Sequence, residues 1–173
     1  NPEWIMYDAL AQAEHDSDAV SIVVSSSKQL LDNLYSCTNA HDSGVELIKN
    51  QQIQFVLSED KGQAIKLIND YSPEHLLVTD TKIDIQLFTN YGSLFIGENS
   101  AVAFGDYCAG PNHTLPTNGA GKFSGGLSVH QFYKVLSTQK INDNGRNILA
   151  KTSAILAQAE GLIYHQKSAT VRQ

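Results

Sequence analysis

The stretch Ala19-Val-Ser-Ile-Val-Val24 indicates the kind of fold, because it is rich in β-branched residues and almost continuously apolar. A run of this kind is typical of a strand that is buried in a sheet. An amphipathic helix is expected ahead of it, capped by Asn1, with Pro2 at the first helical position and an end near His15. The chain therefore opens with a helix followed by a buried strand.

The same alternation continues along the chain. Apolar, strand-like runs occur at Ile53–Leu57, Leu76–Val78 and Ser93–Ile96. Helices are predicted between them, one starting at Ser25–Lys28 and one capped by Asp60. Strands that alternate with helices predict an α/β, Rossmann-like fold, in which a largely parallel sheet carries helices on both faces.

Other segments are expected to be irregular or to extend this layer. Ser36–Ser43 is polar and resembles a loop, and the Gly-rich stretch Gly119–Gly126 is predicted to be a tight turn. Further on, Ser128 is expected to cap one helix, and a last helix is expected over residues 144–164. We therefore predict an α/β domain over residues 1–118 and a C-terminal helical extension over residues 119–173.

Composition and charge exclude several classes of protein. Twelve basic and 18 acidic residues give a net charge of −6 over 173 residues, and no cluster of Lys and Arg is present. This balance argues against nucleic acid or an anionic membrane as the main partner. No apolar run is long enough for a membrane span, and no signal peptide is recognised. Two cysteines make no disulfide framework, so we expect a cytoplasmic protein.

Ala101–Thr117 is dense in groups that bind metals or substrates. It contains a carboxylate, Asp106, and an imidazole, His113, and Pro111 and Pro116 restrict the backbone around that imidazole. Loops held by a rigid scaffold often carry binding and catalytic groups. Two interpretations remain open for this segment, a functional site or an ordered connection.

Two shorter patterns also carry chemical groups. Gln12 and His15 are three residues apart on the first helix, so they share a face and could ligate one metal ion, although such a His is more often a surface or capping residue. Glu74 and His75 are adjacent at the start of a strand and could transfer protons, although spacing alone favours a solvated turn with two polar residues. Cys108 has no activating base fixed beside it, and a small buried residue is the expected role.

Taken together, these motifs resemble the histidinol dehydrogenase family. The resemblance covers the chain in the family's order and rests on Gln12-Ala-Glu-His15, Pro73-Glu-His-Leu76, Gly105-Asp-Tyr-Cys-Ala-Gly-Pro-Asn-His-Thr-Leu-Pro-Thr117, Phe123-Ser-Gly-Gly-Leu-Ser-Val129 and Glu160-Gly-Leu-Ile-Tyr-His165. Each motif alone has modest specificity, whereas the ordered set is highly specific.

The resemblance implies a zinc ion. Gln12, His15 and Asp106 match three of the family's zinc ligands, and His165 matches a fourth that reaches the metal of a neighbouring subunit. A homodimer with a shared active site is therefore implied. Nitrogen and oxygen ligands of this kind suit zinc.

The resemblance also implies the reaction. The family oxidises L-histidinol through the aldehyde to L-histidine with two molecules of NAD. Glu74 and His75 match its acid–base pair, and His113 and Glu160 match groups that hold the substrate. In this scheme His75 takes the hydroxyl proton in each hydride transfer and Glu74 activates the water that hydrates the aldehyde.

The chain departs from the family in its length. It is well under half of the family's usual length and matches the C-terminal part. The missing N-terminal part of the same protein would include the inserted domain associated with NAD. An isolated piece is expected to hold much of the zinc and substrate shell, to bind zinc weakly and to show no turnover. The alternatives are a non-catalytic zinc-binding domain and an oligomerisation fragment.

Overall fold

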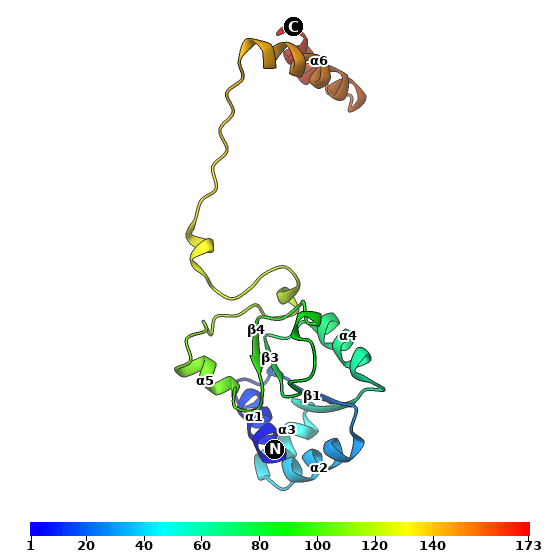
Figure 1. The fold of residues 1–173 in the computed structure, drawn as a ribbon, viewed down its shortest axis with the longest axis vertical. Helices are drawn as coiled ribbons and strands as arrows, with labels where there is room; N and C mark the ends of the chain where they lie inside the picture. The colour runs from blue at the N-terminus through cyan, green and yellow to red at the C-terminus, as the bar shows by residue number, and fades with distance from the viewer. The chain divides into compact units, whose positions relative to one another are not determined.

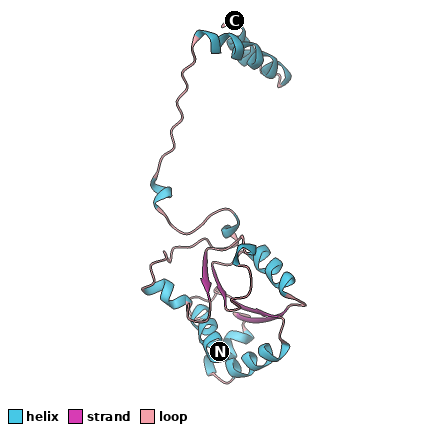
Figure 2. Ribbon diagram, in the orientation of Figure 1, coloured by secondary structure: helices cyan, strands magenta, loops and turns pink.

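The computed structural model describes residues 1–173 as a mixed arrangement of α-helices and short β-strands (Figure 1, Figure 2). In chain order the elements are α1 (Pro2–Ala13), β1 (Ser21–Ser25), α2 (Lys28–Asn39), α3 (Asp42–Lys49), β2 (Ile53–Leu57), α4 (Lys61–Tyr71), β3 (His75–Val78), the 3₁₀ helix η1 (Ile85–Leu87), β4 (Ser93–Ile96), α5 (Val102–Tyr107), the 3₁₀ helices η2 (Ala120–Lys122) and η3 (Val129–Phe132), α6 (Asp143–Ala159) and α7 (Ile163–Thr170). Every helix falls short of the length and apolarity needed to cross a lipid bilayer.

The chain divides into two compact units. The first unit is Asn1–Phe132 and contains all four strands, and the second is Tyr133–Gln173 and contains α6 and α7. The domains predicted over residues 1–118 and 119–173 remain a proposal for the longer protein.

The strands form two separate parallel pairs. β1 pairs with β2 from Ser21 opposite Ile53 to Ser25 opposite Leu57, and β3 pairs with β4, starting at His75 opposite Ser93. Each pair is a two-stranded sheet of its own. The mixed α/β class and the parallel pairing agree with the sequence. A single Rossmann-like sheet is not confirmed, because β1 and β3 are not hydrogen-bonded neighbours.

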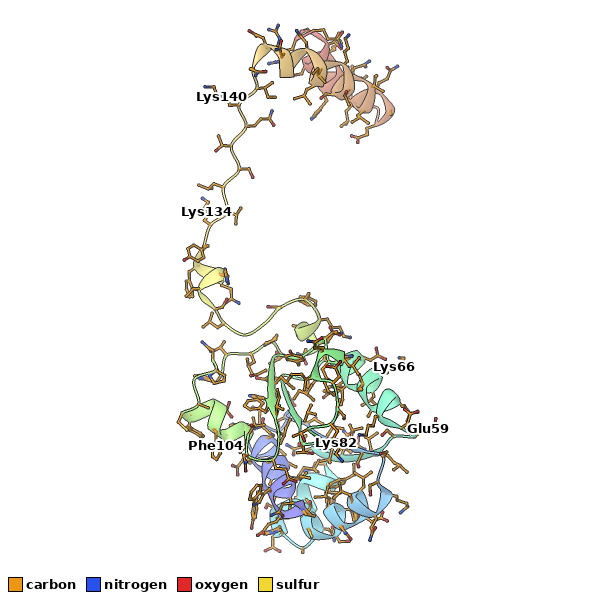
Figure 3. All side chains as sticks on the ribbon, viewed as in Figure 1. Glu59, Lys66, Lys82, Phe104, Lys134 and Lys140 are labelled. Carbon is orange, nitrogen blue, oxygen red and sulfur yellow. The ribbon has the colours of Figure 1, made fainter.

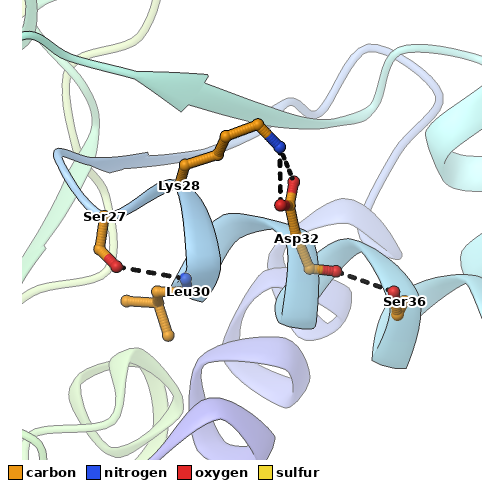
Figure 4. Close-up of polar contacts among 5 residues, drawn as sticks. All are labelled: Ser27, Lys28, Leu30, Asp32 and Ser36. Atoms are coloured by element: carbon orange, nitrogen blue, oxygen red, sulfur yellow. Dashed lines mark hydrogen bonds and ion pairs between the residues drawn. The ribbon is translucent and has the colours of Figure 1, made fainter.

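Local capping explains where the helices begin. The Ser27 hydroxyl oxygen accepts a hydrogen bond from the Leu30 N–H at 3.3 Å (Figure 4), as an N-cap should. From the first position of α2, Lys28 contacts the Asp32 carboxylate at 2.7 Å, and the Ser36 hydroxyl donates to the Asp32 carbonyl at 2.8 Å. The predicted start of α2 is therefore confirmed at Ser27.

The predicted loop at Ser36–Ser43 is wrong. α2 continues to Asn39, and α3 begins at Asp42 after a very short connection. The reason is tertiary: Thr38 is completely buried, so a polar stretch is held in helical form by packing that no local pattern reveals.

The helices of the first unit cover two sides of β1. α1, α2 and α3 pack against one another and against β1 or β2. α4 packs on β1 as well. Figure 1 shows α4 on one side of β1 and α1 to α3 on the other. A small hydrophobic core, built from Leu76, Val78 and Phe88, lies around β3.

The second unit is a pair of helices, and not the single helix predicted for residues 144–164. α6 ends at Ala159 and α7 begins at Ile163, because Gly161 between them adopts the left-handed backbone conformation with φ of 74°. The helix predicted to start at Ser128 is also wrong, since only the 3₁₀ turn η3 forms there. Residues 133–142 have no regular structure, and Lys134 and Lys140 mark this connection in Figure 3.

Alanines fill the contact between the two C-terminal helices. The buried residues of α6 are Ala150, Ala154 and Ala157, which lie on one face and let α7 approach closely. The larger apolar side chains of α6 remain exposed, with Ile148 at 70% and Ile155 at 67%. These larger apolar side chains therefore face away from the contact with α7.

Candidate active site

The candidate site is built where β3 begins. Glu74 immediately precedes the strand and His75 is its first residue. The backbone here is held by two hydrogen bonds, from the Gly92 N–H to the Pro73 carbonyl at 2.9 Å and from the Ser93 N–H to the Glu74 carbonyl at 2.8 Å. His75 therefore lies on a strand, and Glu74 lies directly before it on backbone that is hydrogen-bonded to Ser93.

His75 lies against Asp106. The His75 Nε2 and Asp106 Oδ1 atoms are 3.3 Å apart, and the two side chains are only 15% and 16% exposed. The approach lacks hydrogen-bond geometry, so the buried Nε2 atom has no hydrogen-bond partner. An imidazole nitrogen in this state, beside a carboxylate and with the Phe95 ring 5.9 Å from the imidazole, is available to bind or to move a proton at a ligand.

A glycine positions Asp106. The segment predicted as an irregular loop contains the short helix α5, and in this helix a Cβ on Gly105 would lie 2.5 Å from the ring of Phe95. The missing side chain lets α5 pack closely on β4, which carries Phe95. Because Asp106 is the next residue, this close approach brings its carboxylate to His75.

A second glycine brings the following segment to the same place. A Cβ on Gly92 would lie 2.5 Å from the Glu74 carbonyl oxygen and 3.0 Å from Cδ of Pro116. The chain after α5 therefore passes against the start of β3 and β4. Pro116 belongs to the segment that carries the predicted substrate group His113, so this segment is anchored beside Glu74.

Gln12 shares a cavity with His75. The cavity has a volume of about 400 Å³ and is lined by both side chains. α1, which carries Gln12, packs against α5, which carries Asp106. Both residues lie close to the C-terminal ends of their helices. The predicted ligands Gln12 and Asp106 therefore come from neighbouring helices.

Asp8 is a residue of this cavity that the sequence analysis did not select. It lies one helical turn before Gln12 on α1, and burial raises the pKa of its carboxyl group. Spacing of four residues from Gln12 was the available signal, because side chains at this spacing share a helix face.

Other predicted residues are exposed. His15 lies in the turn after α1, and His113 lies in the irregular segment after α5. Cys108 was expected to be buried, and this expectation is wrong, because it follows the end of α5 in an exposed turn. Cys37 and Cys108 are both free thiols.

The remaining two predicted residues belong to the second unit. Glu160 is the C-cap of α6 and His165 lies in α7, and both are exposed. Within the first unit, His75 and Asp106 are brought into contact, with Glu74 next in the chain and Gln12 on the shared cavity. Nowhere in residues 1–173 do three His, Cys, Asp or Glu side chains gather closely enough to hold a metal ion.

Comparison with known proteins defines the class first: the chain matches a family of dehydrogenases, which are oxidoreductases, along its whole length. The family is histidinol dehydrogenase, whose model matches residues 1–173, and the chain belongs to this family.

Relatives show the same extent of similarity. The chain is 38% identical over 180 residues to histidinol dehydrogenase of Pseudomonas syringae pathovar tomato, covering 99% of this chain and 40% of that protein. It is 36% identical over 183 residues to the enzyme of Hydrogenovibrio crunogenus, covering 99% of this chain and 42% of the relative. The chain thus spans about two-fifths of the length of these relatives.

A solved structure agrees with the sequence comparisons. The crystal structure of histidinol dehydrogenase from Elizabethkingia anophelis superposes with a TM-score of 0.77 at 29% sequence identity. The match covers 99% of this chain and 41% of that one. The first-unit and second-unit elements described above are therefore those of a part of the family's polypeptide.

Proposed function

We propose that this chain carries the zinc- and substrate-binding part of an enzyme that oxidises L-histidinol through the aldehyde to L-histidine with NAD. The observation that carries the proposal is the buried contact between His75 and Asp106, in a chain that matches the family over residues 1–173. This contact joins a predicted proton-transfer group to a predicted metal ligand at the start of β3.

The donor atoms suit zinc. A Gln oxygen, a His nitrogen and an Asp oxygen are ligands that zinc accepts. Gln12 comes from the end of α1, His15 from the turn that follows it, and Asp106 from the end of the neighbouring helix α5. We propose that these three residues, with His165 from a neighbouring subunit, would hold the ion. When bound, zinc would anchor the amine and imidazole nitrogens of the substrate.

His75 is proposed as the base of both oxidation steps. Its Nε2 atom has no hydrogen-bond partner and is shielded from water, so it can accept the substrate hydroxyl proton while hydride leaves the carbinol carbon. NAD, when bound, supplies the hydride acceptor.

Glu74 is proposed to act on water between the two oxidations. Hydration of the aldehyde needs a base that removes a proton from the attacking water, and Glu74 is adjacent to His75 on the same fixed backbone. His113, anchored nearby through Pro116, and Glu160 are proposed to hold the substrate.

The second unit supports a shared site in a homodimer. Its large apolar side chains are exposed, and the residues proposed to bind substrate and metal, Glu160 and His165, lie within it. We propose that this helical pair docks on a neighbouring subunit, where its apolar residues become buried. NAD is proposed to bind chiefly to the part of the family polypeptide that this chain does not span. The enzyme is proposed to work in the cytoplasm.

Zinc content and NADH formation test the proposal. The 173-residue chain is compared with a chimera in which the portion of the Pseudomonas syringae relative outside the matched region is fused to it. We expect little zinc and no histidinol-dependent NADH from the chain, and both from the chimera.

Substitution then assigns the role of His75. In the chimera, His75→Asn should lower kcat by about 100- to 10,000-fold. His41→Asn is the matched control, because His41 precedes α3 and does not line the cavity, and it should leave kcat unchanged. Zinc binding without any NADH from a folded chimera would favour the non-catalytic zinc-binding alternative.

A further inference from the structure

The motif Phe123-Ser-Gly-Gly-Leu-Ser-Val129 has no part in the proposed reaction, yet it contacts the segment that carries His113. The Leu127 N–H donates a hydrogen bond to the Thr114 carbonyl at 2.9 Å. This contact joins two separate segments and holds the motif against the residue that follows His113. We call Gly126 and Leu127 the strap.

A glycine allows the strap to lie this close. A Cβ on Gly126 would lie 2.8 Å from Cδ2 of Leu115 and 3.5 Å from the Thr114 carbonyl oxygen. A Cβ on the preceding residue, Gly125, would meet nothing within 4 Å. The close approach of the two segments therefore requires the absence of a side chain at Gly126 but not at Gly125.

The segment of His113 is held at further points. The Asn112 Oδ1 atom accepts a hydrogen bond from the Thr114 N–H at 2.7 Å, which closes an Asx turn around His113. Pro116 lies against Gly92, where an added Cβ would be 3.0 Å from the proline Cδ. His113 thus stands in a closed turn, and the strap and Pro116 restrain the residues that follow it.

The chain between Thr114 and the strap is also packed on the first unit. Gly121 of η2 lies where a Cβ would be 2.6 Å from the Ser72 Oγ atom and 3.1 Å from the Tyr91 carbonyl carbon. Ser72 is only 2% exposed, so this contact is buried. The segment that leaves at Thr114 and returns at Leu127 is therefore a compact loop whose ends meet.

The backbone contacts matter because the His113 side chain is exposed. Packing of the imidazole itself does little to fix its direction. A group that binds a substrate loses less conformational freedom on binding when its backbone is already held. The strap provides such a restraint from outside the turn that contains His113.

We propose that Gly126 and Leu127 are positioning residues for substrate binding, which fix Thr114 and thereby direct the His113 imidazole at the substrate. The inference rests on the proposed function, in which His113 holds L-histidinol. The strap then acts on the affinity for the substrate, whereas the proposed proton transfers do not depend on it. This assigns a role to the motif at residues 123–129.

Steady-state kinetics of the chimera test the proposal. Gly126→Val places a branched side chain where the strap meets Thr114 and Leu115, so the strap must move away. The KM for histidinol should rise about three- to tenfold, as expected for the loss of one hydrogen bond to the substrate, and kcat should stay unchanged. Gly125→Val is the matched control and should change neither constant. Equal KM values for the two variants overturn the proposal.

A double substitution separates positioning from general destabilisation. His113→Ala should itself raise KM, and Gly126→Val should raise it no further in that background, because the strap acts through His113. A strap with a merely structural role would add its effect to that of His113→Ala. Additive effects therefore overturn the proposal.

Amide hydrogen exchange examines the strap directly in the 173-residue chain. The Leu127 amide, which is bonded to Thr114, should exchange about tenfold or more slowly than it would in an unfolded chain. Gly126→Val should remove this protection and Gly125→Val should keep it, and protection in both variants overturns the proposal. If Gly126→Val does not fold, Gly126→Ala should change KM and exchange in the same directions by smaller factors, because its methyl group displaces the end of the Leu115 side chain.

The strap proposal and the proposed function fail in different ways. NADH formation with equal KM values for the two glycine variants rejects the strap and leaves the function standing. A folded chimera that forms no NADH rejects the proposed function, and histidinol affinity measured by calorimetry then replaces KM in the comparison. Weaker affinity in Gly126→Val alone keeps the strap proposal, whereas no affinity for histidinol in the unsubstituted chimera overturns it as well.

Discussion

The two units of this chain differ in which apolar side chains they bury. In Asn1–Phe132, large apolar side chains such as Leu34 and Phe88 are buried, at 1% and 5% exposure. In Tyr133–Gln173 the buried residues of α6 are alanines, and Ile148 and Ile155 are exposed. The first unit buries large apolar side chains of its own, whereas the second leaves those of α6 exposed.

The largest effect that tests this difference is loss of a buried leucine. Leu34→Ala should lower the free energy of unfolding by about 2–5 kcal/mol, because it removes apolar contacts and leaves a cavity. Ile148→Ala, with 70% of the side chain exposed, should change it by less than about 0.5 kcal/mol. Urea denaturation of the 173-residue chain measures both, and equal losses would remove the contrast between the units.

A smaller effect tests how tightly the first unit is packed around the site. Gly105→Ala should cost about 1–3 kcal/mol, because the new methyl group meets the Phe95 ring and α5 must move. Gly125→Ala is the control, since a Cβ there meets nothing within 4 Å. Urea denaturation again gives the cost. A neutral Gly105→Ala would mean that α5 does not depend on this close contact.

The sequence predicted what local chemistry determines. The caps at Asn1, Ser27 and Asp60 accept hydrogen bonds from helix N–H groups as expected. The strands Ile53–Leu57 and Ser93–Ile96 were also found, because β-branched and aromatic residues are concentrated in them.

What the sequence did not predict depends on tertiary contacts. α5 has no side-chain cap and contains a glycine, so only its packing on Phe95 explains a helix there. The break between α6 and α7, in contrast, was visible as Gly161, since glycine is the usual residue at a helix end with positive φ. For the site, the residue types of His75 and Asp106 were readable, but their contact was not, because it needs β3 and α5 to be placed.

Helix caps provide a third test of the two units. Ser27→Ala removes the cap of α2 and should lower the global free energy of unfolding by about 1 kcal/mol. Asn142→Ala removes the equivalent cap of α6, where the Asn142 oxygen accepts from the Gly145 N–H at 2.9 Å. This second change should reduce helical circular dichroism and leave unfolding of the first unit unchanged. If Asn142→Ala shifts the unfolding transition of the first unit, the two units are coupled.

The smallest expected effect is the pH dependence due to Asp8. Burial raises the pKa of this carboxyl above its ordinary value of 3.8, so the folded chain binds more protons than the unfolded chain between the two values. Stability therefore falls as pH rises through that window, and the penalty is complete above the raised pKa. Asp8→Asn should stabilise the chain at neutral pH, and this gain should vanish in acid.

The measurement is the urea midpoint of Asp8→Asn and of the parent chain from about pH 4 to pH 7. Asp143→Asn serves as the control in the second unit, because Asp143 is 90% exposed, and it should leave the pH dependence of the first transition unchanged. A gain from Asp8→Asn that is the same at every pH would refute the role of burial.

The connection between the units, residues 133–142, limits how far the helical pair can reach. At full extension it spans roughly 33–36 Å. A tether of this length keeps α6 and α7 at an effective concentration of about millimolar near any surface within reach. If two subunits exchange their helical pairs, as proposed for the homodimer, formation of the first contact makes the second one intramolecular. Dissociation then requires both pairs to leave together, so such an assembly should persist at dilutions where a single contact of the same strength would separate.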